Sequence, residues 1–157
     1  MASFLNLIAR LLIVSLWIYC GVNKFQELGK SSEVAIKGIT DFDNWLVKDI
    51  QVGPMPFKDL MLENAQSLVC AIGAIEIIAS LLVLAGSKLG AFLLVVLTVL
   101  MTSMQHNIFY SHFTKDEKIL HARQAYSNFL ILGSLIMVMG YSGKEVAESK
   151  YPIIFIA

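Results

Sequence analysis

The sequence predicts an all-α membrane protein, a polytopic four-helix bundle with an amphipathic helix in its first loop. Its composition is the first observation: 57% of the 157 residues are hydrophobic and only 15% are charged. The mean hydropathy of +0.69 is too high for an ordinary soluble domain of this size. The second observation is that four apolar segments approach the length of about 20 residues that a helix needs to cross a bilayer. We therefore expect one membrane domain over residues 1–157.

The first predicted span covers residues 4–24 and ends in Gly21-Val-Asn-Lys24. Arg10 lies inside its apolar run and no small-residue cleavage site follows, so we expect a retained span and not a signal peptide. The long polar connection after it contains the amphipathic helix, predicted at residues 34–50. Apolar side chains recur there every three or four residues, with charged residues between them, at Ile36, Ile39, Phe42, Leu46 and Ile50. This pattern is typical of a helix that lies on the membrane surface or caps a bundle.

The remaining three spans are predicted at residues 65–86, 89–110 and 124–141. A short turn, Gly86-Ser-Lys-Leu-Gly90, separates the first two of these. Such a short connection makes the two helices antiparallel neighbours. The chain ends in an apolar segment, Ile-Ile-Phe-Ile-Ala, which we expect to pack against another surface.

Glu76 lies near the middle of the second span and carries the strongest functional signal in the sequence. A carboxylate at that depth costs at least about 2.5 kcal/mol, so a proton, a cationic partner or a water-filled cavity must offset it. Arg10 is the candidate partner. Counting residues from the loop-side end of each span puts the two side chains within about 5 Å in depth. The sequence therefore predicts an intramembrane ion pair between Arg10 and Glu76.

The same counting puts a second polar layer, formed by Lys24, His106 and Asn128, within roughly two helical turns of the loop-side surface. These side chains either contact a lipid or quinone headgroup or hydrogen-bond nearby carbonyl groups. No nucleophile and base pair, phosphate-binding loop or metal-ligand spacing accompanies them, so we assign no catalytic residue. Bound lipid or quinone is the only cofactor we consider.

Charge and cysteine usage exclude several classes of protein. The formal net charge is zero and no basic block is present, so a nucleic-acid partner is not indicated. The two cysteines, Cys20 and Cys70, lie in apolar segments without CxxC or Cys/His spacing, which indicates neither a metal site nor a disulfide framework. The expected partners are membrane lipid and other integral membrane proteins.

The order of these polar residues along the chain resembles the DoxX-like superfamily of four-helix membrane proteins. The resemblance covers about residues 7–140 and rests on five features: Arg10, Gly21-Val-Asn-Lys24, Ile72-Gly-Ala-Ile-Glu76, His106 and Asn128-Phe-Leu-Ile-Leu-Gly133. It implies the four-helix membrane fold. The superfamily includes quinone-linked oxidoreductase subunits, cargo receptors and an assembly chaperone, so it implies no single function.

Our hypothesis is a non-enzymatic accessory subunit or assembly factor of a larger membrane complex, with a respiratory-chain complex of the mitochondrial inner membrane favoured. The alternatives are a quinone-linked redox enzyme subunit, in which Lys24, His106 and Asn128 would meet the quinone, and a cargo receptor or chaperone of the endoplasmic reticulum. A bacterial inner membrane also remains open as the location. The N-terminus lacks an Arg- and Ser-rich presequence, so a mitochondrial location would need an internal signal.

Overall fold

The computed structural model describes the backbone of residues 2–106 and 109–150 and the side chains of residues 7–106 and 109–140. The described part contains six α-helices and one short π-helix, and no strand. In chain order these elements are α1 (Ala2–Gln26), α2 (Leu28–Asn44), η1 (Trp45–Ile50), α3 (Lys58–Glu63), α4 (Ala65–Leu84), α5 (Lys88–Gln105) and α6 (Lys115–Lys150). The predicted all-α class is confirmed. The apolar segment that ends the chain lies outside the described residues.

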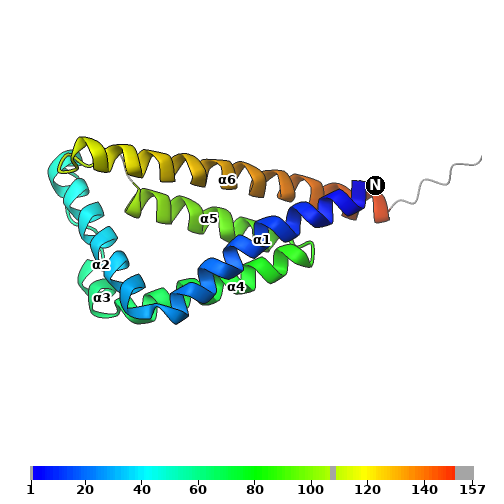
Figure 1. Cartoon of the computed structure of the whole chain (residues 1–157), viewed down its shortest axis with the longest axis horizontal. Coiled ribbons are helices and arrows are strands. Elements are labelled where there is room, and N and C mark those ends of the chain that lie inside the picture. The colour runs from blue at the N-terminus through cyan, green and yellow to red at the C-terminus, as the bar shows by residue number, and fades with distance from the viewer. Residues whose placement is uncertain (1, 107–108, 151–157) are drawn as a thin grey trace, which may run out of the picture.

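The helices form a wedge made of two arms. α1 packs against α4 in one arm, and α5 packs against α6 in the other. Contacts between α4 and α5 join the arms, as the short Gly86–Gly90 turn predicted. Figure 1 shows that the arms lie close together near the N-terminus and diverge toward the end that α2 crosses.

The predicted amphipathic helix at residues 34–50 corresponds to most of α2 together with η1. α2 contacts both α4 and α5, so it caps the wide end of the wedge. Ile39 is buried as the periodicity predicted, whereas Ile36 and Ile50 are exposed because only one narrow face of the helix meets the arms. The helix ends at Ile50, before the two prolines that forbid its continuation.

Among the described residues, three helices are long and apolar enough to cross a membrane: Leu7–Gln26, Ala65–Leu84 and Lys88–Gln105. They correspond to the first three predicted spans. The fourth predicted span, residues 124–141, lies within α6, which is not among these three in the part of the chain that the structure describes. Polar side chains near its start, including Gln124 and Asn128, lower its apolar character.

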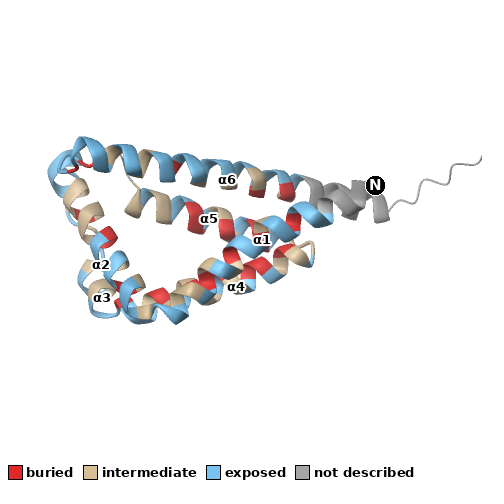
Figure 2. Ribbon diagram, in the orientation of Figure 1, coloured by how far each residue is buried: buried red, intermediate tan, exposed pale blue. Residues whose placement is uncertain are grey.

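The hydrophobic core lies at the narrow end, where the arms converge. It contains residues from α1, α4, α5 and α6: Val14, Trp17, Ala79, Val83, Ala91, Leu94, Leu135 and Val138. Figure 2 shows buried residues on the inward faces of these helices and exposed residues on the outward faces. At Gly90 the helices approach so closely that a Cβ atom would lie 2.5 Å from the carbonyl oxygen of Ala79. The α4–α5 contact therefore requires glycine at this position.

Candidate functional site

The site is built on a close crossing of α1 and α4. A Cβ atom on Gly21 would lie 2.8 Å from the backbone carbonyl oxygen of Gly73, and one on Gly73 would lie 3.1 Å from the carbonyl oxygen of Gly21. Small residues of this kind allow membrane helices to bring their backbones together. The crossing fixes the register of the two helices. It also brings the last turn of α1 within reach of the middle of α4.

Lys24 and Glu76 form an ion pair beside this crossing. Lys24 Nζ lies 2.8 Å from both carboxylate oxygens of Glu76 and donates hydrogen bonds to them. The Glu76 side chain is only 2% exposed, and that of Lys24 is 17% exposed. The lysine therefore supplies the cationic partner that a carboxylate at this depth requires.

The predicted pairing of Arg10 with Glu76 was wrong about the cation. Arg10 is buried, but its Nη1 atom lies 3.2 Å from the position that a Cβ on Gly86 would take. Gly86 lies in the turn after α4, and from Glu76 the helix continues for eight residues, about 12 Å, before that turn begins. The prediction failed because it took the ends of the two spans as level. The Gly21–Gly73 crossing sets a different register, in which Arg10 meets the far end of α4.

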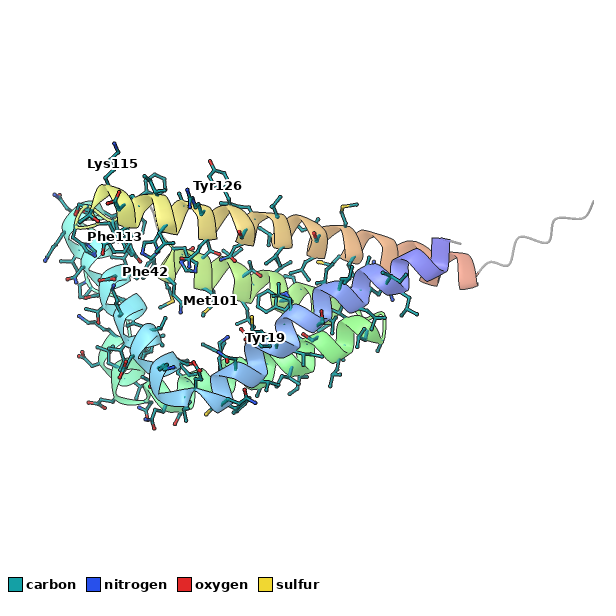
Figure 3. All side chains as sticks on the ribbon, in the orientation of Figure 1. Tyr19, Phe42, Met101, Phe113, Lys115 and Tyr126 are labelled. Atoms are coloured by element: carbon teal, nitrogen blue, oxygen red, sulfur yellow. The ribbon has the colours of Figure 1, made fainter. Side chains whose placement is uncertain are left out.

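A cleft of about 590 Å³ opens beside the ion pair, between the two arms and beneath α2. Figure 3 labels Tyr19 on α1 and Met101 on α5, which line it from opposite arms. Most of its other lining side chains are apolar, among them Val34, Ile39, Leu68, Val69, Ile72, Leu97, Leu100 and Met104. Its polar lining comes mainly from the end of α1 and the start of α2, at Asn23, Lys24, Glu27, Lys30 and Ser31, with Gln105 from α5. The volume is typical of a small-molecule site.

The structure does not bring the predicted polar layer together. Lys24 lines the cleft, but neither His106 nor Asn128 is among its described lining residues. His106 lies at the end of α5 with its Nδ1 atom 3.4 Å from Nδ1 of His121. Asn128 on α6 donates a hydrogen bond of 2.8 Å to Thr102 Oγ1 on α5. The three side chains thus occupy three places, because helical depth alone does not say which neighbour a residue faces.

The two histidines belong to a polar and aromatic junction at the wide end. Burial, reinforced by the neighbouring His121, lowers the pKa of His106 below its usual value. Burial and the charge of Lys37 likewise lower the pKa of His121. Both rings are therefore neutral at pH 7, and one can donate to the other. The His121 ring also stacks on Phe113, with ring centroids 4.5 Å apart.

Tyr110 is the centre of this junction, and the sequence analysis did not single it out. Its side chain is fully buried, and its hydroxyl donates a 2.9 Å hydrogen bond to the carbonyl oxygen of Met104. Burial raises the pKa of Tyr110. Its ring stacks on His112, whose Nε2 atom lies 3.3 Å from Asp41 on α2. The clustering of aromatic residues and histidine in residues 109–113 was the sequence signal that could have identified it.

A second ion pair outside the spans was also missed. Lys58 Nζ lies 2.6 Å from Asp43 Oδ2, and the backbone N–H of Met55 donates to Asp43 Oδ1 over 2.7 Å. These hydrogen bonds, that from Lys58 first, lower the pKa of the Asp43 carboxyl. The pair ties the loop after η1 back to α2. Within the described residues, no three His, Cys, Asp or Glu side chains converge to hold a metal ion.

Fold and site together define a small helical protein with three membrane-length helices and a buried lysine–glutamate pair beside an apolar cleft. The family model described as HR-like lesion-inducing matches residues 2–141, so the chain belongs to the HR-like lesion-inducing family. This match overturns the DoxX-like assignment, which rested on single polar residues and small residues that many membrane helices share. No curated protein and no solved structure matches the chain. The family description names the induction of lesions and no chemical reaction.

Proposed function

We propose that the chain is a non-catalytic integral membrane protein that acts as an accessory subunit or assembly factor of a larger membrane complex. The observation that carries this proposal is the outward surface of the three membrane-length helices. Only 22%, 33% and 22% of the residues in their apolar stretches are buried inside the molecule. Large apolar residues cover the remainder, among them Leu12, Ile78, Leu89 and Phe92. A surface of this kind has to meet lipid or the helices of other proteins.

The pairing of the polar groups supports a non-catalytic role. The carboxylate of Glu76 is satisfied by Lys24, and the amide of Asn128 by Thr102. A catalytic group would instead point toward the position of a reacting atom, with a second group within hydrogen-bond reach of it. Lys24 is among the described residues that line the cleft and His106 is not, which favours this proposal over a quinone-linked redox enzyme that would use both at one headgroup.

Which membrane holds the protein is a separate and more specific part of the proposal. The family description names no membrane, so the mitochondrial inner membrane and its respiratory chain stay part of the proposal. The accessory role does not depend on that host, because it rests on the outward surface. We retain the mitochondrial inner membrane as the first location to examine and the endoplasmic reticulum as the second.

Native gel electrophoresis in mild detergent, combined with photo-crosslinking, tests the proposal. A photoreactive residue is placed at Leu12 on α1 or Leu130 on α6, which are 68% and 76% exposed. Met101, which faces the cleft, is the matched control position. We expect the chain to migrate within a much larger complex and to cross-link to a partner protein from an outward position. Migration near its own mass of 17.4 kDa, with cross-links to lipid alone, would contradict the accessory role.

A further inference from the structure

We propose that the cleft between the two arms binds an uncharged acyl lipid, such as an acylglycerol, with its head beside Lys24 and its chain between α1, α4 and α5. This site goes beyond the accessory role and does not depend on which complex the chain joins. Its volume of about 590 Å³ lies within the range of small-molecule sites, about 300 to 1,000 Å³.

The part of the cleft farthest from α2 suits an acyl chain. Tyr19 on α1, Ile72 on α4 and Leu97 on α5 line it there, each several residues from the polar end of its helix. Met61, Met101 and Met104 add flexible side chains, which adapt well to irregular apolar ligands. Water in such a space would find few hydrogen-bond partners, so an apolar occupant is favoured.

The polar end of the cleft offers hydrogen-bond donors as well as acceptors. An ammonium group carries three donors, and Lys24 uses two of them on Glu76 Oε1 and Oε2. The third is available to a carbonyl or hydroxyl oxygen in the cleft that Lys24 lines. Glu27 and Gln105 provide acceptors in the same lining. A head that carries both an ester carbonyl and hydroxyl groups matches this set, whereas a quinone, which only accepts hydrogen bonds, matches half of it.

The local charge favours an uncharged head. Lys24 is neutralised by Glu76, and Lys30 Nζ lies 3.5 Å from Glu27 Oε1. The charged groups at this end therefore sum to zero. An anionic head would find no spare positive charge and would meet the carboxylate of Glu27.

Thermal unfolding of the purified full-length chain in detergent tests the site with three probes. Monoolein carries the proposed head, oleate carries the same acyl chain with an anionic head, and decylubiquinone carries a carbonyl-only head. At a hundredfold excess over its Kd, monoolein should raise the unfolding temperature by roughly 5–10 °C. Oleate and decylubiquinone should raise it much less.

Variants show whether any shift comes from the cleft. Met101→Trp fills the cleft from α5, and Val34→Phe fills it from α2 at a position tolerant of a larger side chain, since Val34 is 53% exposed. Met137→Trp places the same indole on the outer face of α6, where the side chain is 62% exposed, and serves as the control. We expect the monoolein shift to be lost in whichever filled variant folds and retained in the control.

Three outcomes would overturn the site. They are no shift with monoolein at saturation, a shift that survives both cleft-filling substitutions, and an equal or larger shift with oleate or decylubiquinone. None of these results bears on co-migration with a larger complex, so this inference and the accessory role can fail separately.

Discussion

Two regions of the wedge, the α1–α4 crossing and the junction around Tyr110 at the wide end, are held together by different physics. At the α1–α4 crossing, backbone contacts between Gly21 and Gly73 flank an ion pair whose carboxylate is 2% exposed. At the wide end, the Tyr110 ring lies against Trp45 of η1 and stacks on His112, and its hydroxyl donates to carbonyl oxygens of α5. The partly exposed His112–Asp41 pair links this loop to α2. The crossing has no room for larger side chains and leaves the carboxylate almost without access to water. The junction lies at the polar ends of the spans.

This difference predicts how the stability of the crossing and of the wide end responds to substitution. A buried charge depends on a single partner, because no water can replace it. Interactions near water are individually weaker, since the solvent competes for each hydrogen bond. Substitutions at the crossing should therefore be costly, and those at the wide end should be milder and depend on pH through His106 and His121.

The largest effect is expected from breaking the buried ion pair. Glu76→Gln or Lys24→Met should each lower the free energy of unfolding by about 3 to 5 kcal/mol, because each leaves the other partner unmatched. The double variant Lys24→Met/Glu76→Met should recover most of that loss. Unfolding in mixed detergent measures all three.

The exposed Glu27–Lys30 pair is the control for this prediction. Its carboxylate side chain is 47% exposed, so Glu27→Gln should cost no more than about 0.5 kcal/mol. If the double variant at Lys24 and Glu76 loses as much as the two single variants together, the two residues are not coupled.

The next effect comes from the helix crossing itself. Gly21→Ala would place a methyl group 2.8 Å from both the Gly73 carbonyl oxygen and the Ile77 side chain, so the helices must shift. We expect a loss of about 1 to 3 kcal/mol. Gly133→Ala on α6 meets nothing within 4 Å and should be neutral or stabilise by up to about 1 kcal/mol. Equal unfolding temperatures for the two variants would show that the crossing is not tightly packed.

Much of the fold could be predicted from apolar segment length and turn chemistry. Glu76 was correctly identified as needing a partner, because a carboxylate in a span is costly wherever it lies. The identity of that partner could not be predicted, since the choice of Lys24 over Arg10 depends on a register set by backbone contact at two glycines. The neighbours of His106 and Asn128, which are His121 and Thr102, could not be predicted, because depth along a helix does not specify which face a residue occupies.

A smaller effect is expected at the wide end from Tyr110→Phe. The change removes a hydroxyl that donates to the carbonyl oxygens of Met104 and Ser103, while the ring and its packing remain. The expected loss is about 1 kcal/mol. Tyr126→Phe, at a side chain that is 72% exposed, is the control and should change nothing measurable. A loss as large as that of Glu76→Gln would erase the contrast between the crossing and the wide end.

The smallest effect is the pH dependence of the wide end. The folded protein lowers the pKa of both His106 and His121, so below the unfolded pKa of about 6.5 the unfolded chain binds more protons than the folded one. Stability should therefore be constant above pH 7 and fall as the pH drops through 6.5 toward the lowered values.

The variant His106→Asn/His121→Phe should flatten the unfolding temperature between pH 7.5 and 5, because neither replacement titrates. Asp43 and Glu117, whose pKa values are lowered by hydrogen bonds from Lys58 and Thr114, add a further loss below about pH 4, when those carboxyls are protonated. The Gly21→Ala variant should keep the full pH dependence of the unmodified chain, since it alters only the crossing. If removing both histidines leaves the pH dependence unchanged, the titrating groups lie elsewhere, and the wide end does not differ from the crossing in its response to protons.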